Sequence, residues 1–212
     1  MTNKNEWKHE VVSLILLFVL GSVLGIFAKV IDVLCFEESF WLQGVLNYID
    51  LRNVLSRIPI WSCVALIVAV KSETALKAAL HVLIVLISMC VGYYLYTRMV
   101  CGFNPLNYIL RWGIVAVISP IFGVIVWYAK YSLSKVNIFL SSIVIAFFIS
   151  QIFSFGMWYL AIRYYLEIII MIVTAIYLYR DKEQIILSIF GGIILSPFIK
   201  QAMFGILGIL KI

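Results

Sequence analysis

The chain has 212 residues, of which 65% are hydrophobic and 12% charged, and its formal net charge is +6. Soluble domains average roughly 45–50% apolar and about 25% charged residues, so this chain could not cover its surface with polar groups in water. The composition excludes a soluble protein and indicates an integral membrane protein. The basic residues lie almost wholly at the ends of apolar runs, facing lipid headgroups, so the positive charge does not indicate nucleic-acid binding.

Seven apolar runs predict an all-α, polytopic transmembrane helical bundle, in a single integral membrane domain over residues 1–212. The predicted spans are 11–33, 57–70, a third that ends near residue 96, 106–128, 136–158, 163–179 and 185–207. The first run follows Lys4 and Lys8 but precedes no small-residue cleavage site, so we expect it to remain as the first span.

The polar tract 37–57 lies between the first two spans. Gln43, Asn47, Asp50 and Arg57 fall on one helical stripe, which predicts an amphipathic helix in the membrane interface. Whether the short second run, 57–70, crosses the membrane completely is left open.

Two capping signals and two prolines set expected helix ends and breaks. Ser72 is expected to cap the third span, and Asp181 with Gln184 resembles a capping box before the seventh. Pro120 and Pro197 interrupt the fourth and seventh spans and are expected to kink them.

Short-loop lysines and arginines favour a cytoplasmic N-terminus, because positive charge is enriched on the inner side of a membrane. The inner set would be Lys4, Lys8, Lys71, Lys77, Lys130, Lys135, Arg180 and Lys182, against Arg52, Arg57, Arg98, Arg163 and Lys211 outside. The outer set is rich in arginine, which holds fixed bidentate pairs with carboxylates or phosphates, so the outer half is expected to hold an organised polar site.

Three spans carry small residues at a spacing of four. They are Gly21 and Gly25 in the first span, Ser142, Ala146, Ser150 and Ser154 in the fifth, and Ser188, Gly192 and Ser196 in the seventh. Small residues let helix backbones approach closely in a membrane, so these faces are expected to be buried against other helices.

The candidate ligand-binding residues are the charged side chains at the outer ends of the spans. They are Lys29, Asp32, Arg98, Arg111, Arg163 and Glu167, which we expect to line a cavity beneath the amphipathic helix. Ionisable residues inside a span are costly and usually face a partner or water. A structural alternative stays open, because Lys29 and Asp32 are three residues apart and can pair with each other.

No catalytic or metal-binding pattern is visible in the sequence. The two histidines, His9 and His81, are expected near opposite ends of the first and third spans, with no second ligand at metal spacing. Nucleophile-elbow, zinc-helix and phosphate-loop motifs are absent, so no cofactor and no enzymatic activity are expected. Cys35 and Cys101 could form a disulfide if adjacent, and this is left open.

The stretches GYYLYTR from Gly92, SPIFGVIVWYAK from Ser119 and SQIFSFGMWY from Ser150 occur in this order. In this arrangement the chain resembles an uncharacterised family of small polytopic membrane proteins from Gram-positive bacteria. The resemblance implies a bacterial cytoplasmic membrane and brings no activity with it.

The broken spans, the intramembrane charges and the arginine-rich outer half favour a solute-binding or transport component for a small anionic solute. The alternative is a non-catalytic accessory or immunity-type membrane subunit, acting through helix contacts with a membrane protein partner or in a homo-oligomer. The alternative predicts that large side chains along the small-residue faces would disrupt a complex.

Overall fold

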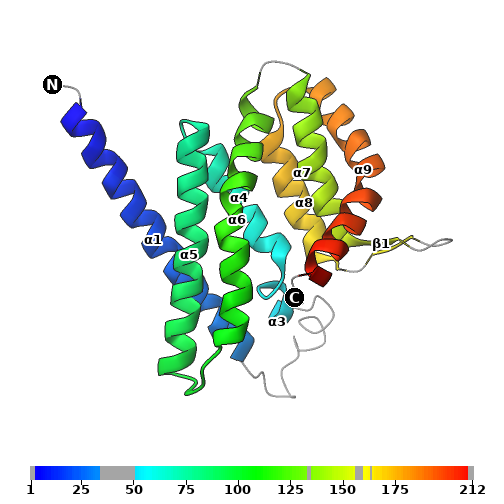
Figure 1. The fold of residues 1–212 in the computed structure, drawn as a ribbon. Helices are drawn as coiled ribbons and strands as arrows, with labels where there is room; N and C mark the ends of the chain where they lie inside the picture. Colours follow the sequence, from blue (N-terminus) through cyan, green and yellow to red (C-terminus); the bar gives the residue numbers. More distant parts are fainter. Residues whose placement is uncertain (1–2, 34–50, 133–134, 156–159, 163, 210–212) are drawn as a thin grey trace, which may run out of the picture.

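The computed structural model describes residues 3–33, 51–132, 135–155, 160–162 and 164–209, and these residues form a helical bundle (Figure 1). The long helices are α1 (Asn3–Val33), α5 (Ala75–Met99), α6 (Leu106–Tyr131) and α9 (Lys182–Ile209). The shorter ones are α3 (Leu51–Val54), α4 (Ile58–Val70), α7 (Val136–Ile152) and α8 (Leu166–Leu178). From α4 onward, successive helices run alternately up and down in Figure 1. The all-α helical bundle predicted from the sequence is therefore confirmed.

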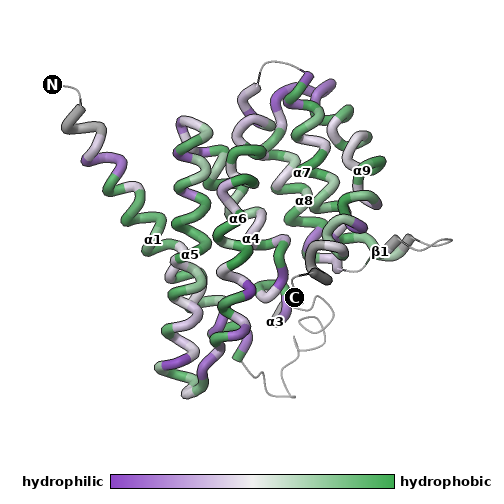
Figure 2. Tube along the Cα trace, viewed as in Figure 1, coloured by the Kyte–Doolittle hydropathy of each residue, from purple (hydrophilic) through white to green (hydrophobic). Residues whose placement is uncertain are grey.

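Within the described residues, four helices are long and apolar enough to cross a membrane: Trp7–Val33, Ala75–Met99, Leu106–Tyr131 and Lys182–Gly205. The apolar helices α4, α7 and α8 are shorter, with 13, 17 and 13 residues. Apolar residues predominate along the middle of the bundle and polar residues gather towards its ends (Figure 2). The protein is thus a helical membrane protein, while a count of seven complete crossings stays a prediction.

Helices α1 and α5 run parallel and pack through glycines. A Cβ at Gly25 would lie 2.0 Å from the carbonyl oxygen of Met89, and one at Gly92 would lie 2.1 Å from that of Ser22. A Cβ at Gly21 would lie 2.0 Å from Ser88 Oγ and 2.3 Å from the Val85 carbonyl oxygen. These backbones touch only because no side chain separates them, so the first small-residue ladder is a packing face within the chain.

Helices α7 and α9 form a second parallel pair, joined by small and polar side chains. Gly191 and Gly192 lie against Ser142 and Ile145. Gln184 donates a hydrogen bond to Ser141 Oγ at 3.2 Å, from buried positions on both helices. The ladders predicted in the fifth and seventh spans therefore meet each other.

Helix α4 lies inside the bundle, packed against α5, α6 and α8. Eight of its 13 residues are buried, which suits a segment without charged side chains between Ile58 and Val70. Pro59 stands in its first turn, as the sequence predicts, where the missing N–H costs no helical hydrogen bond. The buried Trp61 donates its indole N–H to the Leu55 carbonyl, and this hydrogen bond holds the segment before α4 against the helix.

The fifth predicted span ends earlier than expected. Helix α7 stops at Ile152, and the strands β1 (Phe153–Phe155) and β2 (Leu160–Ile162) pair antiparallel, with Phe153 opposite Ile162. Lys200 on α9 donates to the Phe153 carbonyl at 2.6 Å. Strand pairing and this lysine satisfy backbone groups that a helix would otherwise bond, which accounts for the break.

Two local predictions are corrected or completed by the structure. The cap of α5 is Thr74, whose hydroxyl accepts from the Lys77 N–H, and not Ser72, whose hydroxyl donates to the Val68 carbonyl instead. Asp181 does accept from the Gln184 N–H at 2.8 Å, as a capping box requires. Most of the predicted amphipathic tract, residues 37–50, lies outside the described residues; its end contains the single turn α3.

Candidate functional site

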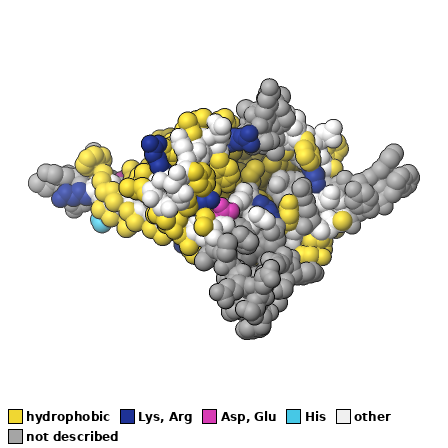
Figure 3. Space-filling model, turned by 90° about the horizontal axis from the view of Figure 1, so that it is seen from below, with side chains coloured by type: hydrophobic (Ala, Val, Ile, Leu, Met, Phe, Trp, Pro, Cys, Tyr) yellow, Lys and Arg dark blue, Asp and Glu magenta, His cyan; other side chains and the backbone are white. Residues whose placement is uncertain are grey.

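Charged side chains gather at the lower end of the bundle as drawn in Figure 1, where α5 ends and α4, α6 and α8 begin. Figure 3 looks onto this end and shows Lys or Arg beside Asp or Glu side chains near its centre, among apolar ones. Five of the six candidate residues predicted from the sequence lie within the described residues, and Arg163 lies outside them.

Lys29 and Asp32 form one local ion pair. The Lys29 ammonium lies 2.5 Å from Asp32 Oδ2, and Lys29 is buried to 6% exposure. The ammonium also faces the rings of Tyr93 and Phe103, at 5.5 and 5.3 Å from their centroids. A carboxylate and two aromatic faces compensate the lysine without a ligand, which supports the structural alternative for this pair.

Arg98 and Arg111 lie in different surroundings. Arg98 is exposed and donates to the hydroxyl of Tyr94, one turn back on α5, at 2.7 Å. Arg111 lies on α6 and lines a cavity described below. Among the described residues Arg111 has no ion-pair or hydrogen-bond partner, which distinguishes it from Lys29 and Arg98.

Glu167, in the first turn of α8, pairs with a residue outside the predicted set. Its Oε1 accepts from Arg57 Nη1 at 2.6 Å, and its side chain is 1% exposed. The Arg57 guanidinium also stacks on the ring of Tyr164, 3.6 Å from the centroid. Arg57 is the N-cap residue of α4, so the pair joins the starts of two neighbouring short helices.

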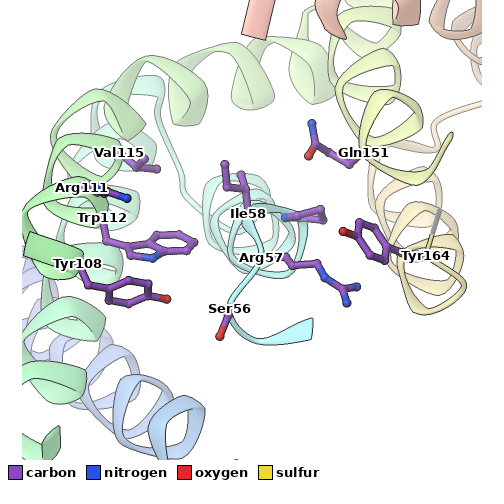
Figure 4. A pocket seen from close by; sticks show the side chains of 10 residues that line it. Ser56, Arg57, Ile58, Tyr108, Arg111, Trp112, Val115, Gln151 and Tyr164 are labelled. Carbon is purple, nitrogen blue, oxygen red and sulfur yellow. The ribbon is translucent and has the colours of Figure 1, made fainter. Parts of the chain in front are cut away.

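A cavity of about 330 Å³ lies beside this pair, between the start of α4, helix α6, the end of α7 and Tyr164, two residues before α8. Figure 4 shows α6 side chains along one wall, Gln151 and Tyr164 along the other, and the start of α4 between them. The lining residues are Ser56, Arg57, Ile58, Pro59, Tyr108, Arg111, Trp112, Val115, Gln151 and Tyr164.

Helical periodicity explains the α6 wall. Tyr108, Arg111, Trp112 and Val115 follow at steps of three, one and three, so they share one face of the helix. Tyr108 and Trp112 also pack on each other, with ring centroids 6.3 Å apart. The α6 wall of the cavity therefore consists of two packed aromatic rings together with Arg111.

The cavity favours an anion with an apolar body. Two of its ten lining residues are charged, and both are arginines. Arginine binds carboxylate and phosphate oxygens through paired N–H groups, while Trp112, Tyr108 and Tyr164 offer ring faces and hydroxyls. Small-molecule sites typically enclose about 300–1,000 Å³ with mostly apolar walls and few polar groups, which this cavity matches.

A second polar cluster joins α1 to α5 at the opposite end of the bundle. Lys77 lies between Glu10, at 2.7 Å, and Glu73, at 2.6 Å. His81 lies 3.2 Å from Glu10 Oε1 and 2.9 Å from the Ser72 hydroxyl. The sequence placed His9 and His81 near opposite ends, which is wrong because α1 and α5 run parallel. No group of three metal-ligating side chains occurs within the described residues.

Arg57 is the site residue that the sequence analysis did not select. It stands between the polar tract and the second span, so it was assigned to the stripe of an amphipathic helix. The signal that could have marked it is an unmatched acid, since Glu167 begins a short apolar helix without a local basic neighbour on its own helix. Their separation of 110 residues hides the pairing from any local pattern.

No family model, no curated protein and no solved structure matches this chain. Any assignment of function therefore rests on the cavity and the charges around it.

Proposed function

We propose that this membrane protein is a solute-binding or transport component that takes a small anionic solute into the cavity between α4, α6, α7 and Tyr164. The observation that carries the proposal is Arg111, an arginine that lines an aromatic cavity and has no partner among the described residues. Arg111 is exposed, so its guanidinium is free to pair with an anion that enters the cavity.

The solute class follows from the walls. A carboxylate, sulfate or phosphate group would pair with Arg111, and an apolar or aromatic body would lie against Trp112 and Tyr108 on the same wall. Membership of the Gram-positive membrane family, a bacterial cytoplasmic membrane and a cytoplasmic N-terminus belong to the same proposal. They rest on the sequence resemblance and the distribution of lysine and arginine.

The alternative function, an accessory or immunity-type subunit, has less support. It assigns the small-residue ladders to a partner protein, but Gly21 and Gly25 already contact α5, and Ser142 already contacts α9. The faces of α1 and α9 that remain exposed carry large apolar side chains, as expected of helices that contact lipid.

Binding of sulfate and benzoate to the purified full chain in detergent tests the proposal, with Trp112 in the cavity wall as a fluorescence reporter. We expect Arg111→Gln to weaken binding roughly 10- to 100-fold, because a charge-assisted hydrogen bond is worth about 1.5–3 kcal/mol. Arg98→Gln is the matched control, since Arg98 does not line the cavity. Equal affinity of the Arg111→Gln and Arg98→Gln variants would refute the site.

A further inference from the structure

An apolar groove of about 730 Å³ lies between α8 and α9, with α7 as its floor. Both flanking helices pack against α7, and they meet it on different sides. The walls carry exposed isoleucines, Ile172 and Ile176 on α8 and Ile189 and Ile193 on α9. The groove is therefore open to the surrounding lipid and is lined by side chains that lipid tails can contact.

The groove is about as long as one leaflet of a bilayer. Along α9 it extends from Ile185 to Ser196, which is about 16 Å at about 1.5 Å per residue. It ends beside Phe153, where α7 gives way to β1. A hydrocarbon core of about 30 Å has about 15 Å in each leaflet. The groove thus matches the length of one lipid acyl chain, whereas a transmembrane helix of a partner would extend well beyond it.

Two basic side chains stand where the groove reaches the end of the bundle, beside Tyr179. Tyr179 lines the groove, and its carbonyl oxygen accepts from Lys130 Nζ at 2.7 Å. Arg180, the next residue, donates from Nη1 to the carbonyl of Ser132, just beyond the end of α6. The two side chains therefore join the same two segments of the chain from opposite sides, which brings two positive charges to one end of the groove.

Neither of these two charges is balanced by an acid. In the part of the chain that the structure describes, Lys130 and Arg180 form no ion pair. Asp181, the nearest acid along the chain, accepts from the Gln184 N–H at the start of α9 instead. An ammonium has three N–H groups and a guanidinium has five, so both side chains retain donors after their bonds to carbonyl oxygens. Phosphate oxygens would accept from these donors and supply the missing negative charge.

We propose that this groove binds an anionic phospholipid, with one acyl chain between α8 and α9 and the phosphate between Lys130 and Arg180. The chain fills the space that separates the two helices, and the phosphate joins the end of α6 to the start of α9. The sequence analysis assigns both basic residues to the cytoplasmic side, and anionic lipids are concentrated in the cytoplasmic leaflet. The site does not depend on the proposed function, because Arg111 lies near the other end of α6.

Native mass spectrometry of the full chain in detergent tests the site, with phosphatidylglycerol and phosphatidylcholine of identical acyl chains as probes. We expect the wild type to bind one phosphatidylglycerol at least about tenfold more tightly than phosphatidylcholine. Lys130→Gln and Arg180→Gln should each weaken phosphatidylglycerol binding roughly 10- to 100-fold, because each removes a charge-assisted hydrogen bond to the phosphate. Lys182→Gln is the matched control, since it removes one exposed positive charge at the same end and should bind as the wild type does.

A second pair of variants tests the position of the acyl chain. Ala175→Trp places a large side chain in the groove from α8, so it should weaken binding of both lipids. Ala202→Trp, at an exposed position on α9 outside the groove, should leave binding of both lipids unchanged.

Three results would overturn the proposal. The first is equal wild-type affinity for the two lipids, which decides even if the charge variants do not fold. The second is equal affinity of Arg180→Gln and Lys182→Gln for phosphatidylglycerol. The third is a lipid-free dimer that Ala175→Trp converts to a monomer, which would show that a second copy of the chain fills the groove.

Discussion

Replacement of Gly25 by alanine should separate α1 from α5. The added Cβ would lie 2.0 Å from the Met89 carbonyl oxygen, about 1.4 Å inside the 3.4 Å of ordinary contact. The neighbouring atoms are backbone on both sides, so a whole helix must move. A gap of 0.5–1 Å already loses about a quarter to a half of the dispersion energy, and overpacking costs about 1–3 kcal/mol. We expect the free energy of unfolding of the Gly25→Ala variant to fall by about 2 kcal/mol.

Gly113→Ala on α6 is the matched control, because nothing lies within 4 Å of the Cβ that it adds. Alanine is favoured over glycine within a helix by about 0.5–1 kcal/mol, so this change should stabilise the protein. In thermal unfolding in one detergent, the midpoint temperature should fall by roughly 4–8 °C for Gly25→Ala and rise for Gly113→Ala. Midpoints that move in the same direction would refute the close contact between α1 and α5.

Three further predictions concern single interactions. A double-mutant cycle of Lys29→Met and Asp32→Asn should show a favourable coupling of about 1 kcal/mol in urea unfolding, and zero coupling would mean that the pair adds nothing. Gln184→Leu should lower the free energy of unfolding by about 1–2 kcal/mol, because it removes the buried hydrogen bond that Gln184 donates to Ser141 on α7 and the one that it accepts from the Arg180 N–H. Thermal unfolding measures this loss, and Glu183→Gln in the same turn should have no effect. Thr74→Ala should cost about 1 kcal/mol through loss of the α5 cap, seen as faster hydrogen exchange in its first turn.

The fold was largely predictable because its signals are local. Each apolar run contains a helix, and the start of the fourth span at residue 106 was placed correctly, since α6 begins at Leu106. The ladders of small residues identified the packing faces, since close approach requires small side chains whichever helix is the partner. The early end of α7 was not predictable, because it depends on Lys200, which is 47 residues away along the chain.

The candidate site was predictable only in part, because some of its contacts join residues that are far apart in the sequence. Lys29 and Asp32 are three residues apart, so their pairing could be anticipated as an alternative. Arg111 was selected because it is a charge within a span, and that reasoning needs no partner. The Arg57–Glu167 pair depends on the contact between α4 and α8, which no local pattern contains.

The 13-residue length of α8 affects the surrounding lipid. At about 1.5 Å per residue, the helix measures about 20 Å, whereas a typical hydrocarbon core is about 30 Å thick. Ile169, Ile172 and Ile176 form an exposed stripe along this short helix. If α8 crosses the bilayer, the acyl chains that cover this stripe must compress beside it, while those around the 25-residue α5 need not. The bilayer would then be thinned on the α8 side of the protein and not on the α5 side.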